Sequence, residues 1–160
     1  MCGTDCLAYQ GKYYTLTDQR IPYRRDKTED ERFFILTLFA IAYEIEAMGR
    51  YSDTLMRIQL AVGLQPAHIG VQAKRFINYF DGRGAISYQF RGKPYAVYIE
   101  NTACFQKSIS SAVATVKNLT ASPKLLVVDI GGFTADYVRL RNGGPDMSAC
   151  DSLENGVILL

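Results

Sequence analysis

The sequence predicts an α/β protein. Apolar residues recur at three- and four-residue steps in some segments, which is the period of a helix with one buried face. In the segments between them, apolar residues alternate with polar ones or run continuously, as in strands. The two kinds of segment follow one another along 160 residues, of which 48% are hydrophobic. Such a chain packs helices against a sheet around a sizeable core.

Composition excludes several classes of protein. The formal charge of +2 argues against a broad nucleic-acid footprint. No apolar run approaches the roughly 20 residues of a membrane span, and the N-terminus shows no signal-peptide pattern. We therefore expect a soluble, cytoplasmic protein without a direct nucleic-acid or membrane partner. Its four cysteines are expected to be reduced thiols, with a zinc site or structural disulfides as the alternative.

A hairpin and a long helix are expected first. Residues 7–16 indicate two short strands around a Gln-Gly turn. A helical pattern follows within residues 21–49, where Thr28 and Glu31 fit a capping box and Gly49 follows the last periodic residue. We expect one face of this helix to be buried.

The middle of the chain alternates between the two structures. Residues 54–64 predict a strand, and residues 66–82 predict a helix that ends near a glycine. Residues 85–100 predict a hairpin with an Arg-Gly turn, and residues 105–119 predict a third helix.

The last part of the chain is expected to form a strand-hairpin module. Residues 124–130 and 134–141 predict two strands, and an Asn-Gly-Gly turn follows them. Residues 118–123 contain the best candidate for a boundary. We therefore expect an N-terminal lobe over residues 1–119, and a hairpin with the start of a second lobe over residues 120–160.

The stretch "LLVVDIGGFTADYVRL" contains the chemically informative residues. Asp129 ends a buried strand, Gly131 and Gly132 form the turn, and Thr134 and Asp136 follow. Glycine adopts positive φ and lets a ligand approach the backbone, and successive N–H groups in such a turn bind anions. The two acids suit a phosphate only with a divalent cation between them, and Mg²⁺ is commonly held by carboxylates plus phosphate oxygens. The alternative is a plain hairpin whose second acid is solvated.

The same stretch resembles the second phosphate-binding hairpin of the superfamily of actin, heat-shock ATPases and sugar kinases. Together with "IQLAVGLQPAHI", "FRGKPYAVYIENTACFQKS" and "SLENGVILL", it resembles the bacterial plasmid-segregation actin-like proteins of the ParM type. The similar segments occur in the same order over essentially the whole chain. The resemblance implies an actin-like ATPase fold, which is ribonuclease H-like, with a mixed sheet and flanking helices.

Site residues follow from the resemblance position by position. Asp129, Gly131, Gly132 and Thr134 match the residues that contact the β- and γ-phosphates and Mg²⁺, and Asp136 matches the second acid, a further metal ligand. These matches imply ATP or GTP with Mg²⁺ as the cofactor of the complete protein.

Two further residues match the family. Gln106, at the start of the third predicted helix, falls where the family places the residue that orients the attacking water, which is a matter of positioning. The alternative is a polar helix-start residue without a catalytic role. Gly156 matches a glycine that follows the hairpin.

The sequence also departs from the family pattern. It lacks the first phosphate loop and ends before the adenosine-contacting segment, so we expect a fragment truncated at both ends. Gln65 stands where relatives commonly have a proline.

We therefore expect part of a nucleotide-dependent, filament-forming protein, with weak nucleotide binding and little or no hydrolysis of its own. The alternative is a non-enzymatic assembly or regulatory module that keeps the lobe but has lost the nucleotide site. A sugar or acetate kinase relative fits less well. Expected partners are further copies of the chain, associated through sheet edges near the C-terminus, and a plasmid adaptor protein.

Overall fold

The structure is a computed structural model that describes residues 5–19, 22, 24–109, 113, 118, 121, 123–154, 156 and 157. Contacts between residues divide the chain into two compact units. The first consists of Met1–Leu60 and Arg75–Thr102, and the second of Ala61–Lys74 and Ala103–Leu160. The expected division into lobes at residues 119 and 120 stays a prediction.

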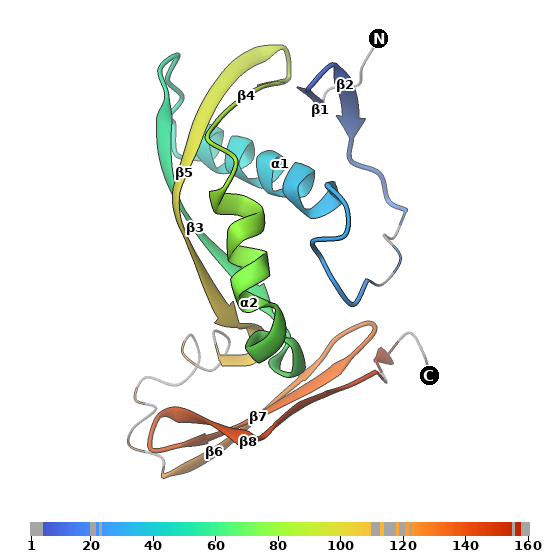
Figure 1. Cartoon of the computed structure of the whole chain (residues 1–160), viewed down its shortest axis with the longest axis vertical. Helices are drawn as coiled ribbons and strands as arrows, with labels where there is room; N and C mark the ends of the chain where they lie inside the picture. The colour runs from blue at the N-terminus through green and yellow to red at the C-terminus, as the bar shows by residue number, and fades with distance from the viewer. Residues whose placement is uncertain are drawn as a thin grey trace. The chain divides into compact units, whose positions relative to one another are not determined.

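Two helices lie between strands in the first half of the chain, and the long elements described after them are strands (Figure 1). In order they are β1 (Cys6–Tyr9), β2 (Lys12–Thr15), α1 (Arg32–Ala47), β3 (Met56–Leu64), α2 (Pro66–Asp81), β4 (Ala85–Phe90), β5 (Lys93–Gln106), β6 (Lys124–Ile130), β7 (Ala135–Arg141) and β8 (Gly144–Leu153). Of the third predicted helix, residues 107–109 and 113 are helical, while Phe105 and Gln106 belong to β5. Most of its other residues lie outside those described.

The strands form two sheets. A five-stranded sheet has the order β2-β1-β4-β5-β3, and a three-stranded sheet has the order β6-β7-β8. The pairs β1–β2, β1–β4, β4–β5, β6–β7 and β7–β8 are antiparallel. Strands β3 and β5 run in the same direction in Figure 1, so the larger sheet is mixed, as predicted.

Three hairpins share one turn chemistry. In each, two residues with positive φ connect the strands and the second is a glycine, which is the arrangement of a type I′ turn. The pairs are Gln10-Gly11, Arg91-Gly92 and Asn142-Gly143. These turns lie where the sequence predicts them. The type I′ turn needs a left-handed backbone, and glycine at the second position adopts it without strain.

The core of the first unit is aromatic. Along β4, Ile86, Tyr88 and Phe90 are buried while the residues between them are exposed, as the alternating pattern predicts. Helix α1 packs on the buried face, where the rings of Phe39 and Phe90 meet edge to face with 5.8 Å between their centroids. The Arg83 guanidinium lies 3.6 Å from the centroid of a further buried ring from α1.

Helix α1 begins in a different way from the prediction. The capping box of Thr28 and Glu31 does not form: Thr28 donates its hydroxyl to Asp26 at 2.7 Å, and Glu31 makes no side-chain cap. Instead, the hydroxyl of Tyr79 on α2 accepts the N–H of Phe34 at 3.0 Å. A donor of the first helical turn is thus satisfied by a side chain distant in sequence.

The structure also bears on the expectations for the cysteines and for membrane-spanning helices. Cys6 is disulfide-bonded, so the expectation of reduced thiols is wrong for this residue, whereas Cys104 and Cys150 are reduced thiols, as expected. No helix among the described residues combines the length and the apolar character needed to cross a bilayer.

Candidate functional site

The two acids of the predicted site face each other across the β6–β7 hairpin. Asp129 and Asp136 are directly opposite partners in the ladder, and Val127 and Val138 form the next pair on the same face. This face is the inner one, because Val138 is fully buried and belongs to the core of the second unit. The ladder register therefore brings the two predicted metal ligands together.

Asp136 occupies an unusual environment for a carboxylate. Its residue is only 4% exposed, and among the described residues no hydrogen-bond partner reaches its buried Oδ1 atom. Like charges directly opposite each other in a sheet are destabilising, and a buried acceptor without a partner costs about 1–3 kcal/mol. A cation held between Asp129 and Asp136 would relieve both costs.

The turn between the acids is held by a second chain segment. The Gly131 N–H donates to the carbonyl oxygen of Thr134 at 2.8 Å, which closes the turn. The carbonyl of Gly131 accepts the N–H of Val157 at 3.0 Å, and the carbonyl of Phe133 accepts the N–H of Gly156 at 3.1 Å. Residues 156 and 157 therefore fix the turn from outside the hairpin.

The glycines of the turn differ from the prediction in their backbone conformation. Neither Gly131 nor Gly132 adopts a positive φ. A Cβ at Gly131 would lie 3.2 Å from the Thr134 carbonyl oxygen, a distance tighter than that of most real Cβ contacts. The Gly132 carbonyl lies directly against Gly156. Close packing of backbone therefore favours glycine at residues 131 and 156, and the turn is compact.

Backbone donors are available at this turn. Among the described residues, no acceptor binds the N–H of Gly132 or of Thr134. Only Phe133 separates these two residues, and backbone N–H groups that a turn presents close together form an anion-binding concavity. The turn thus offers amide donors beside two carboxylates, a combination that suits an anion bound together with a cation.

Thr134 has a partner that the sequence analysis missed. Its hydroxyl accepts a hydrogen bond of 2.9 Å from Nε2 of Gln65, and the residue is only 6% exposed. Gln65 stands between β3 and α2, at the position noted as a departure from the family pattern. That departure was the one signal in the sequence that pointed to it.

Gln106 lies at the end of a strand, in the same compact unit as the hairpin. It is the last residue of β5, and it is 5% exposed. Helical residues 107–109 follow it directly, and the Lys107 stem packs where a Cβ at Gly63 would be. The water-orienting role of Gln106 stays a prediction.

The acid pair fits Mg²⁺ bound with phosphate better than a metal bound by protein alone. Within the part of the chain that the structure describes, no group of three or more His, Cys, Asp or Glu side chains comes together. Mg²⁺ is commonly bound through one or two carboxylates and completes its octahedron with waters and phosphate oxygens. Asp129 and Asp136 match that donor set.

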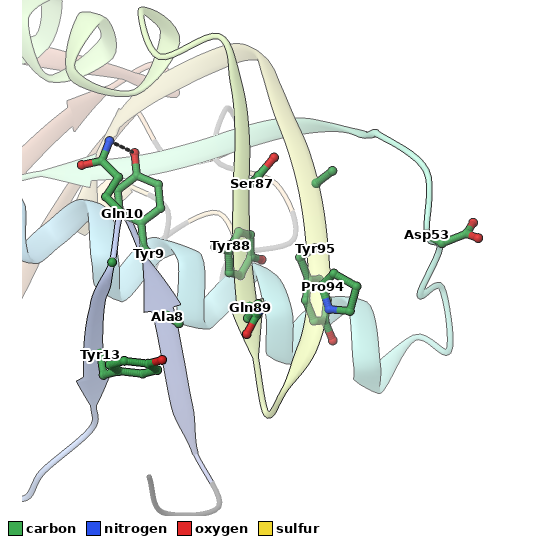
Figure 2. A pocket seen from close by; sticks show the side chains of 12 residues that line it. Ala8, Tyr9, Gln10, Tyr13, Asp53, Ser87, Tyr88, Gln89, Pro94 and Tyr95 are labelled. Atoms are coloured by element: carbon green, nitrogen blue, oxygen red, sulfur yellow. Dashed lines mark hydrogen bonds between the residues drawn. The ribbon is translucent and has the colours of Figure 1, made fainter. Parts of the chain in front are cut away.

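A separate cavity of about 450 Å³ lies on the outer face of the larger sheet (Figure 2). Figure 2 shows Tyr13 on β2, Ser87 on β4 and Pro94 on β5 along this face. Asp53 is the one charged residue among those that line it. A lone carboxylate does not form a phosphate site, so the hairpin remains the candidate.

No protein-family model and no curated protein matches the sequence. Solved structures do match in shape. A filament of AlfA bound to AMPPNP matches with a TM-score of 0.72 at 16% identity, over 99% of this chain and 57% of the AlfA chain. The archaeal actin homolog Ta0583 matches with a TM-score of 0.74 at 13% identity, over 98% of this chain and 51% of that chain. The chain has an actin-like fold.

A third structure, of the actin-like protein Alp7A, matches this actin-like chain with a TM-score of 0.70 at 19% identity, over 96% of this chain and 47% of that one. The chain thus spans about half the length of the solved structures it matches. The predicted actin-like fold, with a mixed sheet and flanking helices, is confirmed.

Proposed function

We propose that this chain is the phosphate-holding part of an actin-like, filament-forming protein of the plasmid-segregation type. Its hairpin would bind the phosphates of ATP or GTP together with Mg²⁺. The observation that carries the proposal is the pair Asp129 and Asp136, opposite each other with a buried carboxylate oxygen left unsatisfied among the described residues.

The residues of the hairpin divide the binding between them. Amide donors of Gly132 and Thr134 would bind phosphate oxygens, and Asp129 and Asp136 would hold the cation. Bound Mg²⁺ supplies charge neutralisation of the phosphates. Two structures of the same fold are of an AlfA filament bound to AMPPNP and of a Bacillus thuringiensis ParM with ATP. These ligands support the choice of a nucleotide.

Weak or absent hydrolysis by the chain itself is part of the proposal. Stabilising the transition state of phosphoryl transfer requires a preorganised site that excludes water. The hairpin contributes phosphate ligands from a single turn, and Gln106 would orient the attacking water only in a complete site. We therefore expect this chain to bind ATP with weak or no hydrolysis.

A nucleotide-dependent shift in thermal unfolding tests the proposal. The full 160-residue chain is unfolded with and without millimolar Mg-ATP, Mg-GTP or Mg-ADP. A ligand that binds the native state at 100 times its Kd adds about 2.7 kcal/mol, which is visible in the midpoint. Asp129→Ala should abolish the shift, and Asp53→Ala, in an exposed loop of the other unit, should keep it. No shift with any nucleotide would overturn the proposal.

A second function is favoured by a different observation. Strand β6 is an edge of its sheet, and Leu126, Val128 and Ile130 on its outer face are 62%, 55% and 64% exposed. An edge strand with an apolar face favours pairing with another chain. The alternative function is therefore a non-enzymatic assembly module that associates with further copies of itself. A plasmid adaptor, a bacterial source and a cytoplasmic location stay predictions.

A further inference from the structure

Gln65 connects the start of α2 to the proposed phosphate turn. Its side-chain amide donates to the Thr134 hydroxyl at 2.9 Å. Its backbone carbonyl oxygen accepts the N–H of His68 at 3.0 Å in the first turn of α2. We propose that Gln65 is a positioning residue that orients the Thr134 hydroxyl toward a bound phosphate. This inference rests on the proposed function of the hairpin.

The direction of the hydrogen bond decides where the hydroxyl proton points. A threonine hydroxyl has one proton to donate and two lone pairs to accept with. Because Nε2 of Gln65 donates, it occupies a lone pair of Thr134 and cannot also receive the hydroxyl proton. Thr134 is almost completely buried, so solvent has little access to its hydroxyl. The proton is left for an acceptor at the turn, such as a phosphate oxygen.

A second contact links the same helix start to the sheet of the hairpin. The N–H of Ala67 points to the Ser152 hydroxyl at 3.4 Å, and Ser152 is the ladder partner of Asp136 on β8. The first residues of α2 therefore contact the sheet at two places, beside Thr134 and beside the acid pair, all within one compact unit. Gln65 is thus anchored at its backbone while its amide reaches the turn.

The chemistry requires a neutral donor at this position. A glutamate is nearly isosteric with glutamine, but its ionised carboxylate can only accept hydrogen bonds. It would therefore accept the hydrogen bond that the Thr134 hydroxyl could otherwise donate to a phosphate. It would also add negative charge to a hairpin that already carries Asp129 and Asp136. A glutamine satisfies both requirements, since it donates and carries no charge.

The test compares affinity with stability in the full chain. Binding of Mg-ATP and of magnesium pyrophosphate is measured by calorimetry for the wild type, Gln65→Glu, Thr134→Val and the double variant. We expect Gln65→Glu and Thr134→Val each to weaken binding about tenfold or more. Gln65→Glu should weaken binding less in the Thr134→Val background, because there only its added charge still acts. Gln89→Glu, on an exposed face of the other unit, is the matched control and should bind as the wild type does.

Urea unfolding of each variant separates positioning from folding. The inference predicts a loss of affinity that is larger than the change in stability accounts for, with rescue in Thr134→Ser, which keeps the hydroxyl. Wild-type affinity in Gln65→Glu would overturn the inference and leave the proposed function standing. An equal loss from Gln65→Glu in the Thr134→Val background would also overturn it. A wild type that binds neither probe would overturn the proposed function and, with it, this inference.

Discussion

Gly156 lies directly against the peptide that joins Gly132 to Phe133. A Cβ at residue 156 would overlap the carbonyl group of Gly132 and the nitrogen of Phe133. The same segment makes two backbone hydrogen bonds to the turn, from Gly156 to Phe133 and from Val157 to Gly131. Backbone packed on backbone in this way cannot adjust by side-chain rotation, so the position requires glycine and the turn is held rigidly.

Gly156→Ala should therefore destabilise the chain. Overpacking against backbone costs about 1–3 kcal/mol, and part of this cost should appear as a loosened turn. The measurement is the free energy of unfolding in urea. Gly144→Ala is the matched control, because a Cβ there would lie 3.8 Å from the Arg141 carbonyl oxygen, an ordinary contact. Equal losses in the two variants would show that the packing of Gly156 has no special cost.

Removing one charge of the acid pair should stabilise the chain when no cation is present. In EDTA, Asp129→Asn should raise the free energy of unfolding by about 0.2–1 kcal/mol, since it ends the repulsion from Asp136. With Mg-ATP the wild type should be the more stable of the two, because the variant loses a ligand of the cation. Thermal unfolding under the two conditions measures both effects. Asp151→Asn, at an exposed position on β8, should leave the Mg-ATP effect unchanged; a loss there would point to nonspecific charge screening.

Local signals in the sequence predicted local structure. The type I′ turns at Arg91-Gly92 and Asn142-Gly143 depend on residues that are adjacent in the chain, and the alternation along β4 and β5 depends on burial of one face. The two strands of the β6–β7 hairpin were predicted from the same alternation, whereas the pairing of Asp129 with Asp136 comes from the structure. These features need no knowledge of distant contacts.

The contacts that complete the site are not local. Gln65 reaches Thr134 across 69 positions, and Tyr79 reaches Phe34 across 45. A capping box was predicted for α1 because the sequence around Thr28 fits one, yet the tertiary partner replaced it. Gly131 was expected to allow a left-handed turn, whereas close packing against the Thr134 carbonyl oxygen is its observed constraint. Periodicity and turn chemistry carry no information on such partners.

Tyr79 should contribute to stability through its hydroxyl. It accepts the N–H of Phe34 at 3.0 Å and donates to the carbonyl oxygen of Asp30 at 2.7 Å, so it satisfies groups at the start of α1. Tyr79→Phe should lower the free energy of unfolding by about 1–3 kcal/mol, because it leaves a helix-start donor without its partner. Urea unfolding measures the change. Tyr13→Phe is the control, since Tyr13 is 75% exposed, and a similar loss there would refute the capping role.

Asp146 should make part of the stability depend on pH. The Ser148 hydroxyl, at 2.6 Å, and the Arg139 guanidinium, at 2.7 Å, lower the pKa of Asp146 to about 2. Because the pKa in the folded state is below that of the unfolded chain, this stabilisation is present above about pH 4 and is lost as pH falls toward 2.

The comparison of the wild type with Asp146→Asn tests this. The difference in free energy of unfolding should be constant near neutral pH and should shrink between about pH 4 and pH 2. Ser148→Ala should remove a part of the same pH-dependent difference, whereas Ser87→Ala, on the other sheet, should give a difference that does not vary with pH. A difference for Asp146→Asn that is independent of pH would contradict the assignment.

Self-association should depend on the outer face of β6. Leu126 and Val128 are more than half exposed on a strand that pairs only with β7 among the described residues, so a second copy can pair with its free edge and cover its apolar face. Leu126→Lys and Val128→Lys should lower the molar mass that light scattering measures after size exclusion, with urea unfolding nearly unchanged because both sites are exposed. Val71→Lys, at a position on α2 that is 81% exposed, is the matched control and should keep the wild-type mass. A wild type that stays monomeric at high concentration, or an equal effect of Val71→Lys, would show that β6 is not the surface of association.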